Sequence, residues 1–254
     1  MEIKYLEWNL HAMGGEGYSI PKFTTQYIKS VDIFVLTEFC SAKGWETFKS
    51  EIEKDFDVFV SPYFSKQCNQ VCIGLRKEID YKLLSVVTAD VCNIMVPEYL
   101  QIDIEIEGRE LSIIGTRIKT QNDDSKVFQY NYLKKILRNI DTFICLGDFN
   151  CVHRVLSNKF KTVANVYGPR VKDGYHSFVF NKSDDNKRGL DWIIFKGVDV
   201  YNGYEDKKQS PNATYDWSFI SSENGYRDKT KNDYLGIRGL PDHAILKGMV
   251  KIEV

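Results

Sequence analysis

The stretch Ile144-Cys145-Leu146-Gly147-Asp148-Phe149-Asn150 runs an apolar strand directly into a carboxylate and an amide. Asp148 and Asn150 stand two residues apart, so on an extended backbone both side chains project from the same face of the strand. A polar pair after an apolar strand is a common way for a fold to present ligands to a metal ion or a phosphate. We therefore expect part of a functional site at this strand end.

Polar residues stand at four further predicted strand boundaries. In chain order they are Asn9 after the apolar run that starts at Ile3, Glu38 after 33–36, Asp191 before 193–195, and Asp242-His243 before the last apolar run. A single short motif is weak evidence, because such motifs recur by chance and need the right strand context. A series of five, each at a predicted strand boundary, is far more specific.

This ordered series of Asn, Glu, Asp-x-Asn, Asp and Asp-His resembles the endonuclease/exonuclease/phosphatase superfamily, which contains deoxyribonuclease I, exonuclease III, neutral sphingomyelinases and inositol polyphosphate 5-phosphatases. The resemblance spans almost the whole chain. It implies an α+β fold of the deoxyribonuclease I type, a four-layer α/β/β/α sandwich. Two mixed β-sheets pack face to face with helices outside, and the motifs meet at one end.

The hydrophobic pattern also indicates a mixture of strands and helices. From Leu100 to Ile106 the even positions are apolar and the odd positions polar, which predicts a strand with one solvent-facing side. The segment 107–110 predicts a turn, and 111–118 the returning strand. Helices are expected over 22–30, 44–54 and about 123–139. Asp123 or Asp124 would cap the last helix, whose apolar stripe begins at Val127.

We expect one domain over residues 1–254, because any cut between the first and last motifs would divide a single site. The N-terminal segment lacks the pattern of a signal peptide, and no apolar run is long enough to cross a membrane. The spacing of the six cysteines fits neither a zinc site nor a disulfide framework. These observations predict a cytoplasmic protein with reduced thiols and without a membrane partner, and no obligate protein partner is evident.

Charge is nearly balanced over the whole chain but not along it. The formal net charge is −1, whereas the segment 154–188 carries eight basic residues against three acidic ones and contains five Phe or Tyr rings. Cations interleaved with aromatic side chains suit phosphates and bases. The alternative is a solvated loop with a few buried rings.

Hydrolysis of a phosphodiester needs neutralisation of a phosphoryl oxygen and an activated water, and hard oxygen ligands suit this task. Glu38 is the carboxylate that we expect to bind Mg²⁺, with Mn²⁺ as a possible substitute. Asn9 and Asp242 are expected close by, as ligands of the metal or of its waters. The alternative for Glu38 is a helix cap or an ordinary surface charge.

The resemblance implies the remaining roles. Asp148 would orient or deprotonate the attacking water, Asn150 would donate its amide to phosphoryl oxygens, and Asp191 would orient the ring of His243. His243 is suited to proton transfer or to stabilising a pentacovalent phosphorus, since its ordinary pKa lies near neutrality. For Asp148 and Asn150 the alternative is an Asx turn.

Substrate phosphate would be held by Asn9, His11 and Arg117. At Arg117 the chain departs from the family, where a His or Tyr is common. A guanidinium can clamp a phosphate with two hydrogen bonds but does not exchange protons near neutral pH. The sequence thus predicts a Mg²⁺-dependent phosphoesterase, most simply a nuclease acting on DNA or RNA. The alternatives are an enzyme for inositol phosphates, phospholipid head groups or nucleotides, and a non-catalytic binding module on the same fold.

Overall fold

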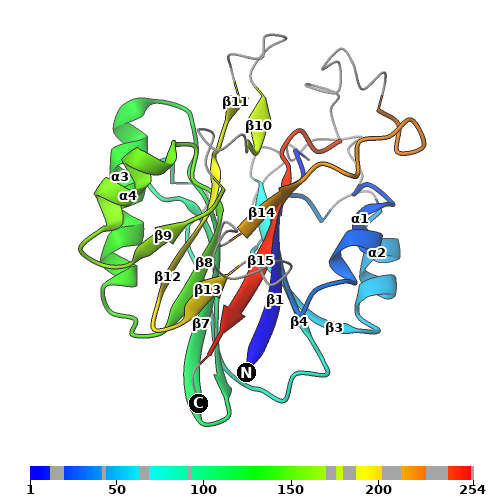
Figure 1. The fold of residues 1–254 in the computed structure, drawn as a ribbon, viewed down its shortest axis with the longest axis horizontal. Helices are drawn as coiled ribbons and strands as arrows, with labels where there is room; N and C mark the ends of the chain where they lie inside the picture. The colour runs from blue at the N-terminus through cyan, green and yellow to red at the C-terminus, as the bar shows by residue number, and fades with distance from the viewer. Residues whose placement is uncertain are drawn as a thin grey trace.

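The fold is described from a computed structural model, which covers residues 1–11, 20–41, 44–62, 69–90, 93–169, 176–179, 187–201, 213–226 and 240–252. Within these residues, two β-sheets pack face to face and helices cover their outer surfaces (Figure 1). The predicted α/β/β/α architecture is confirmed.

The first sheet has the strand order β13-β15-β1-β2-β4-β3, with β14 also paired to β15. Its strands are β1 (Glu2–Asn9), β2 (Ile33–Phe39), β3 (Phe56–Val60), β4 (Gln70–Arg76), β13 (Asp199–Tyr201), β14 (Ala213–Asp216) and β15 (Ile245–Lys251). β1 and β2 run parallel, and their neighbours run antiparallel to them. Asn9 and the end of β2 therefore reach the same end of the sheet.

The second sheet has the order β5-β6-β7-β8-β12-β9. Its strands are β5 (Lys82–Thr88), β6 (Glu98–Ile106), β7 (Arg109–Arg117), β8 (Phe143–Asp148), β9 (Asn165–Tyr167) and β12 (Asp191–Lys196). β7 and β8 are parallel, and β12 is antiparallel to β8. A separate small hairpin of β10 (Phe178–Val179) and β11 (Lys187–Arg188) projects from the top of the sandwich in Figure 1.

Helices α1 (Thr24–Ile28) and α2 (Trp45–Ile52) lie outside the first sheet, and α3 (Asp123–Leu137) and α4 (His153–Phe160) lie outside the second (Figure 1). Buried apolar side chains form three clusters, one between the sheets and one under each pair of helices. Ile73 and Ile113 belong to the middle cluster, whereas Phe34 and Cys145 face the helices. Successive side chains of a strand thus pack into different clusters, one between the sheets and one under the helices.

Three local predictions were wrong in detail. The cap of α3 is Asn122, whose side chain accepts a hydrogen bond from the Ser125 amide at 2.7 Å. Val127 is 48% exposed and does not belong to the buried stripe of α3. The turn between β6 and β7 contains only Glu107 and Gly108, whose φ angles of 52° and 77° are typical of a type I′ turn.

Gly147 allows the close approach of β7 and β8. A Cβ atom at this position would lie 1.8 Å from the carbonyl oxygen of Thr116, so a larger residue would push the two strands apart. The register of these strands places Arg117 directly beside Asp148. Gly147 therefore brings two polar residues together at the end of the second sheet.

Two other expectations concern the cysteines and the helices. Cys72, Cys145 and Cys151 form no disulfide within the described residues, and Cys68 and Cys92 lie outside them. Among the helices that the structure describes, none combines the length and apolar character that a membrane span requires.

Candidate active site

Polar side chains from both sheets meet at the end of the sandwich near the β10–β11 hairpin. Asn9 ends β1, Glu38 is the penultimate residue of β2, and Asp148 ends β8. Asp191 opens β12 and pairs with Asp148 across the antiparallel ladder. All of these residues are buried, so their charges lie in surroundings where electrostatic interactions are strong.

The Asn9 side chain connects the two sheets. Its Nδ2 donates to Glu38 Oε1 at 3.2 Å and to Asp148 Oδ2 at 3.1 Å. Its Oδ1 accepts a hydrogen bond from the His11 amide at 2.9 Å. Asn9 therefore fixes both carboxylates relative to each other, and this contact adds to the metal and phosphate roles predicted for it.

Three residues of the site adopt left-handed backbone conformations. His11 has φ 50°, Glu38 has φ 45° and Asn150 has φ 48°. The pairing of β2 with β4 shifts register between Leu36 and Phe39, and this irregularity surrounds Glu38. Such conformations cost of order 1–3 kcal/mol for a residue with a side chain and are found most often at functional sites. The backbone thus turns Glu38 out of the regular alternation of β2.

Asp148 and Asn150 form a closed local pair. The Asn150 amide donates to Asp148 Oδ1 at 2.8 Å, and Asn150 Nδ2 donates to Asp148 Oδ2 and to the Ile118 carbonyl oxygen, both at 2.8 Å. The Asx turn is therefore present together with the site. Burial raises the pKa of the Asp148 carboxyl to about 7; Asp191 also raises it, while His243 and Arg117 act in the opposite direction.

His243 and Asp191 form a buried pair. Nδ1 of His243 lies 2.8 Å from Asp191 Oδ2 and 3.1 Å from Oδ1, so the ring's Nε2 points away from the carboxylate. Burial alone would lower the pKa of His243, but the carboxylates around it, Asp191 first among them, raise it well above 6.5. The structure thus places the Asp191 carboxylate in contact with the His243 ring, and the role of Asp191 in orienting that ring stays a prediction.

Neighbouring side chains hold this pair in place. Trp8 Nε1 donates to the carbonyl oxygen of His243 at 3.0 Å, and the Tyr215 hydroxyl donates to that of Asp191 at 2.6 Å. Asp148, Asp191 and His243 each offer a ligand atom within 4.8 Å of the others, an arrangement that could hold a metal ion. The sequence assigned these three to catalysis instead.

His11 and Asp242 lie at the edge of the site. His11 Nδ1 is 3.3 Å from the Leu240 carbonyl oxygen and 3.7 Å from Asp242 Oδ2. Burial raises the pKa of Asp242, an effect that His243 and His11 oppose. With Arg117, whose Nη2 lies 2.7 Å from Glu38 Oε1, all nine predicted site residues are joined by contacts. Their individual roles stay predictions.

Two buried carboxyl groups of the site were missed. Glu7 points between the sheets and accepts a hydrogen bond from Thr37 Oγ1 at 3.0 Å. Burial, Asp191 and Asp148 raise the pKa of Glu7 well above its ordinary value. The other carboxyl is Glu98, which lies 4% exposed beside Arg117. Glu7 shares the phase of Ile3 and Tyr5, so the period of two was the signal that could have found it.

Part of the basic, aromatic segment 154–188 reaches the site. Phe178 on β10 forms a β-bridge with His243, and the two rings are 4.8 Å apart. By contrast, α4 packs on the second sheet, and Lys159 lies 4.7 Å from the Tyr130 ring. Arg170 and Lys172 lie outside the described residues. The segment therefore combines a packing helix with a hairpin beside His243.

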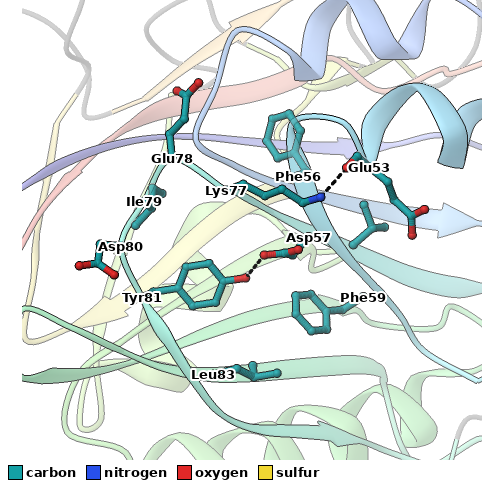
Figure 2. Close-up of a pocket in the computed structure, with 11 residues that line it drawn as sticks. Glu53, Phe56, Asp57, Phe59, Lys77, Glu78, Ile79, Asp80, Tyr81 and Leu83 are labelled. Atoms are coloured by element: carbon teal, nitrogen blue, oxygen red, sulfur yellow. Dashed lines mark hydrogen bonds between the residues drawn. The ribbon is translucent and has the colours of Figure 1, made fainter.

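A large cavity of about 860 Å³ lies elsewhere, at the opposite end of the sandwich where β3 begins and β4 ends. Figure 2 shows the Lys77 ammonium donating to the Glu53 carbonyl oxygen and the Tyr81 hydroxyl donating to Asp57, both at 2.6 Å. These polar groups satisfy one another. The buried polar cluster is therefore the better candidate for chemistry.

Two mixed sheets packed face to face, with a buried cluster of carboxylates, an amide and a histidine across one end, are the architecture of the endonuclease/exonuclease/phosphatase fold. Full-length structural matches to proteins of that family confirm the resemblance at the level of the fold.

No family sequence model and no curated protein sequence matches this chain, whereas solved structures do. A Bacteroides vulgatus endonuclease/exonuclease/phosphatase has a TM-score of 0.68 at 12% identity, with 100% of both chains covered. ANGEL2, a 2′,3′-cyclic phosphatase in complex with adenosine-2′,3′-vanadate, has a TM-score of 0.68 at 11% identity over 100% of this chain and 96% of its own. D. rerio TDP2 complexed with a single-stranded DNA product has a TM-score of 0.61 at 14% identity over 98% and 99%.

Proposed function

We propose that this chain is a Mg²⁺-dependent phosphodiesterase that acts on nucleic acid. The observation that carries the proposal is the joining of Asp148, Asp191 and His243 in one buried cluster that Asn9 ties to Glu38. Phosphodiester hydrolysis needs a general base, a histidine oriented by a carboxylate, and a separate acidic ligand for the metal ion.

The donor set fits a divalent cation. The site gathers six carboxyl groups around the Arg117 guanidinium and two histidines; they belong to Glu7, Glu38, Glu98, Asp148, Asp191 and Asp242. Glu38 Oε1 contacts Asn9 and Arg117, and no hydrogen bond to its Oε2 is found among the described residues. Glu38 would hold Mg²⁺, with Asn9 and Asp242 near it or near its waters. When bound, the metal would neutralise a phosphoryl oxygen and stabilise the leaving oxygen.

The protein's own groups supply the proton transfers. Asp148, with a pKa raised by burial to about 7, is suited to accept a proton from the attacking water near neutral pH. His243, whose pKa Asp191 keeps high despite burial, is protonated there and can donate from Nε2 to the phosphoryl group. The Asx turn at Asn150 keeps the Asp148 carboxylate in one orientation.

Nucleic acid is favoured by the aromatic side chain beside His243. Phe178 is partly exposed, and its ring centroid lies 4.8 Å from that of His243. A partly exposed ring next to a phosphate site offers a surface on which a base can stack. The single-stranded DNA held by D. rerio TDP2, a chain of the same fold, supports the same substrate class.

A substrate panel tests the proposal. Purified protein and its Asp148→Ala variant would be incubated with Mg²⁺, Mn²⁺ or EDTA and offered single- and double-stranded DNA, RNA, RNA ending in a 2′,3′-cyclic phosphate, and inositol phosphates. We expect metal-dependent cleavage of a nucleic acid by the wild type alone. Cleavage restricted to inositol phosphates would replace the proposed substrate class. A folded protein inactive on the whole panel would instead indicate a binding module.

A further inference from the structure

Glu98 is a buried carboxylate that contacts the site through one residue. It opens β6 and pairs with Arg117 across the β6–β7 ladder. Its Oε1 lies 3.2 Å from Arg117 Nη1, and its Oε2 has no hydrogen-bond partner in the described part of the chain. At 4% exposure this charge is almost fully removed from water, which is costly for an incompletely paired carboxylate. Stability alone does not account for a carboxylate here.

Arg117 is shared among three carboxylates. Nη2 lies 2.7 Å from Glu38 Oε1 and Nη1 lies 3.2 Å from Glu98 Oε1. The Nε atom is 3.8 Å from Asp148 Oδ2 and makes no hydrogen bond. The shortest of these contacts is thus made with the residue that we assign to the metal ion.

A cation at Glu38 changes this balance. It competes with the guanidinium for the same carboxylate and repels the positive charge of Arg117 at short range. Asp148 offers Arg117 no hydrogen bond, so Glu98 is the carboxylate that remains to hold the guanidinium at the site. Held there through Nη1, Arg117 can direct Nη2 from Glu38 to a phosphoryl oxygen.

We propose that Glu98 is the positioning residue of Arg117, which it anchors beside the substrate phosphate when Glu38 is engaged by the metal ion. This inference rests on the proposed function for the metal at Glu38. The alternative is that Glu98 and Arg117 form a structural ion pair without influence on phosphate. The two are distinguished by phosphate binding measured with and without Mg²⁺.

A double-mutant cycle on inorganic phosphate tests the proposal without requiring turnover. Wild type, Glu98→Gln, Arg117→Ala and the double variant would be titrated with phosphate by calorimetry, in Mg²⁺ and in EDTA. Glu98→Gln preserves the shape and one acceptor atom, and Glu110→Gln, an exposed position at the far end of β7, serves as the matched control. Arg117→Lys provides a second background, since a lysine keeps the charge but not the two-pronged contact.

We expect Glu98→Gln to weaken phosphate binding about tenfold in Mg²⁺, the effect of losing one charge-assisted contact, and less than about threefold in EDTA. In either Arg117 background the same substitution should have no further effect. On the best substrate of the panel, it should raise KM more than it lowers kcat.

The proposal would be overturned if Glu98→Gln weakened phosphate binding equally with and without Mg²⁺. It would also be overturned if Glu98→Gln weakened phosphate binding as much in the Arg117 variants as in the wild type. Inactivity on every substrate would count against the proposed function alone, because the phosphate cycle still reports whether Glu98 and Arg117 act together.

Discussion

The substitution Glu98→Gln should change how stability depends on pH, and the size of the change follows from the burial of Glu98. Burial raises the pKa of its carboxyl from 4.5 to about 7, against the opposing effect of Arg117. Between these two pKa values the Glu98 carboxyl stays protonated in the folded protein but has lost its proton in the unfolded chain. The wild type therefore loses stability as pH rises from about 4.5 to about 7, whereas a glutamine at position 98 contributes no such dependence.

One pKa unit corresponds to about 1.4 kcal/mol, and about 1.5 units separate pH 5.5 from the folded-state pKa. Between pH values of about 5.5 and 8.5 the wild type should therefore lose about 2 kcal/mol of unfolding free energy relative to Glu98→Gln. Groups that titrate alike in both proteins cancel in this difference. The remaining neighbours that can contribute are Glu38, Lys119 and Asp148, the other charges that act on Glu98.

Urea denaturation of wild type, Glu98→Gln and the exposed control Glu110→Gln at both pH values would measure the difference. We expect the free energy of unfolding of Glu98→Gln to increase relative to that of the wild type at the higher pH. The control Glu110→Gln should show the same pH dependence as the wild type. Parallel pH profiles for all three proteins would refute the reasoning, since they would show that the native state does not hold the extra proton. A gain in stability with a loss of phosphate binding would indicate a residue retained for function.

Three further predictions address the catalytic assignments. Glu38→Gln should raise the Mg²⁺ concentration needed for half-maximal hydrolysis while circular dichroism stays unchanged; an unaltered metal requirement would rule out Glu38 as the ligand. Asp148→Ala and His243→Ala should each abolish most hydrolysis, and the double variant should be scarcely worse than the poorer single one, because residues that serve one step lose activity non-additively; near-wild-type turnover of either folded variant would defeat the mechanism. Asp191→Asn should lower kcat by about 10⁴ and move the loss of activity at alkaline pH to lower pH, because His243 loses the carboxylate that keeps its pKa high; a pH–rate profile with the wild-type alkaline limb would contradict the pairing.

Most of the candidate site could be predicted from the polar residues at the ends of apolar strands. Asp148 and His243 were found because each stands at the boundary of an apolar run, and a period of two fixes which side chains share a face. The same rule located Asn9 and Asp191. Local patterns sufficed for these residues because adjacent strands of a sheet bring their ends to one edge.

Glu98 was missed because its role depends on the register of a hairpin. A four-residue turn over 107–110 shifts the pairing of β6 and β7, whereas the actual two-residue turn sets Glu98 opposite Arg117. The left-handed backbone of Glu38 was missed for a similar reason. It arises from the irregular pairing of β2 with β4, and no feature within β2 alone requires it.

Because the candidate site is divided between two sheets, it can form only after distant parts of the chain have been synthesised. The Asn9 and Asp148 side chains that bond to each other stand 139 positions apart, and the bond from Trp8 to the His243 carbonyl spans 235. β1 gains its neighbour β15 only after residues 245–251 have been synthesised. A polypeptide that ends before residue 243 contains Glu38 and Asp148 but not His243, so it cannot form the buried cluster.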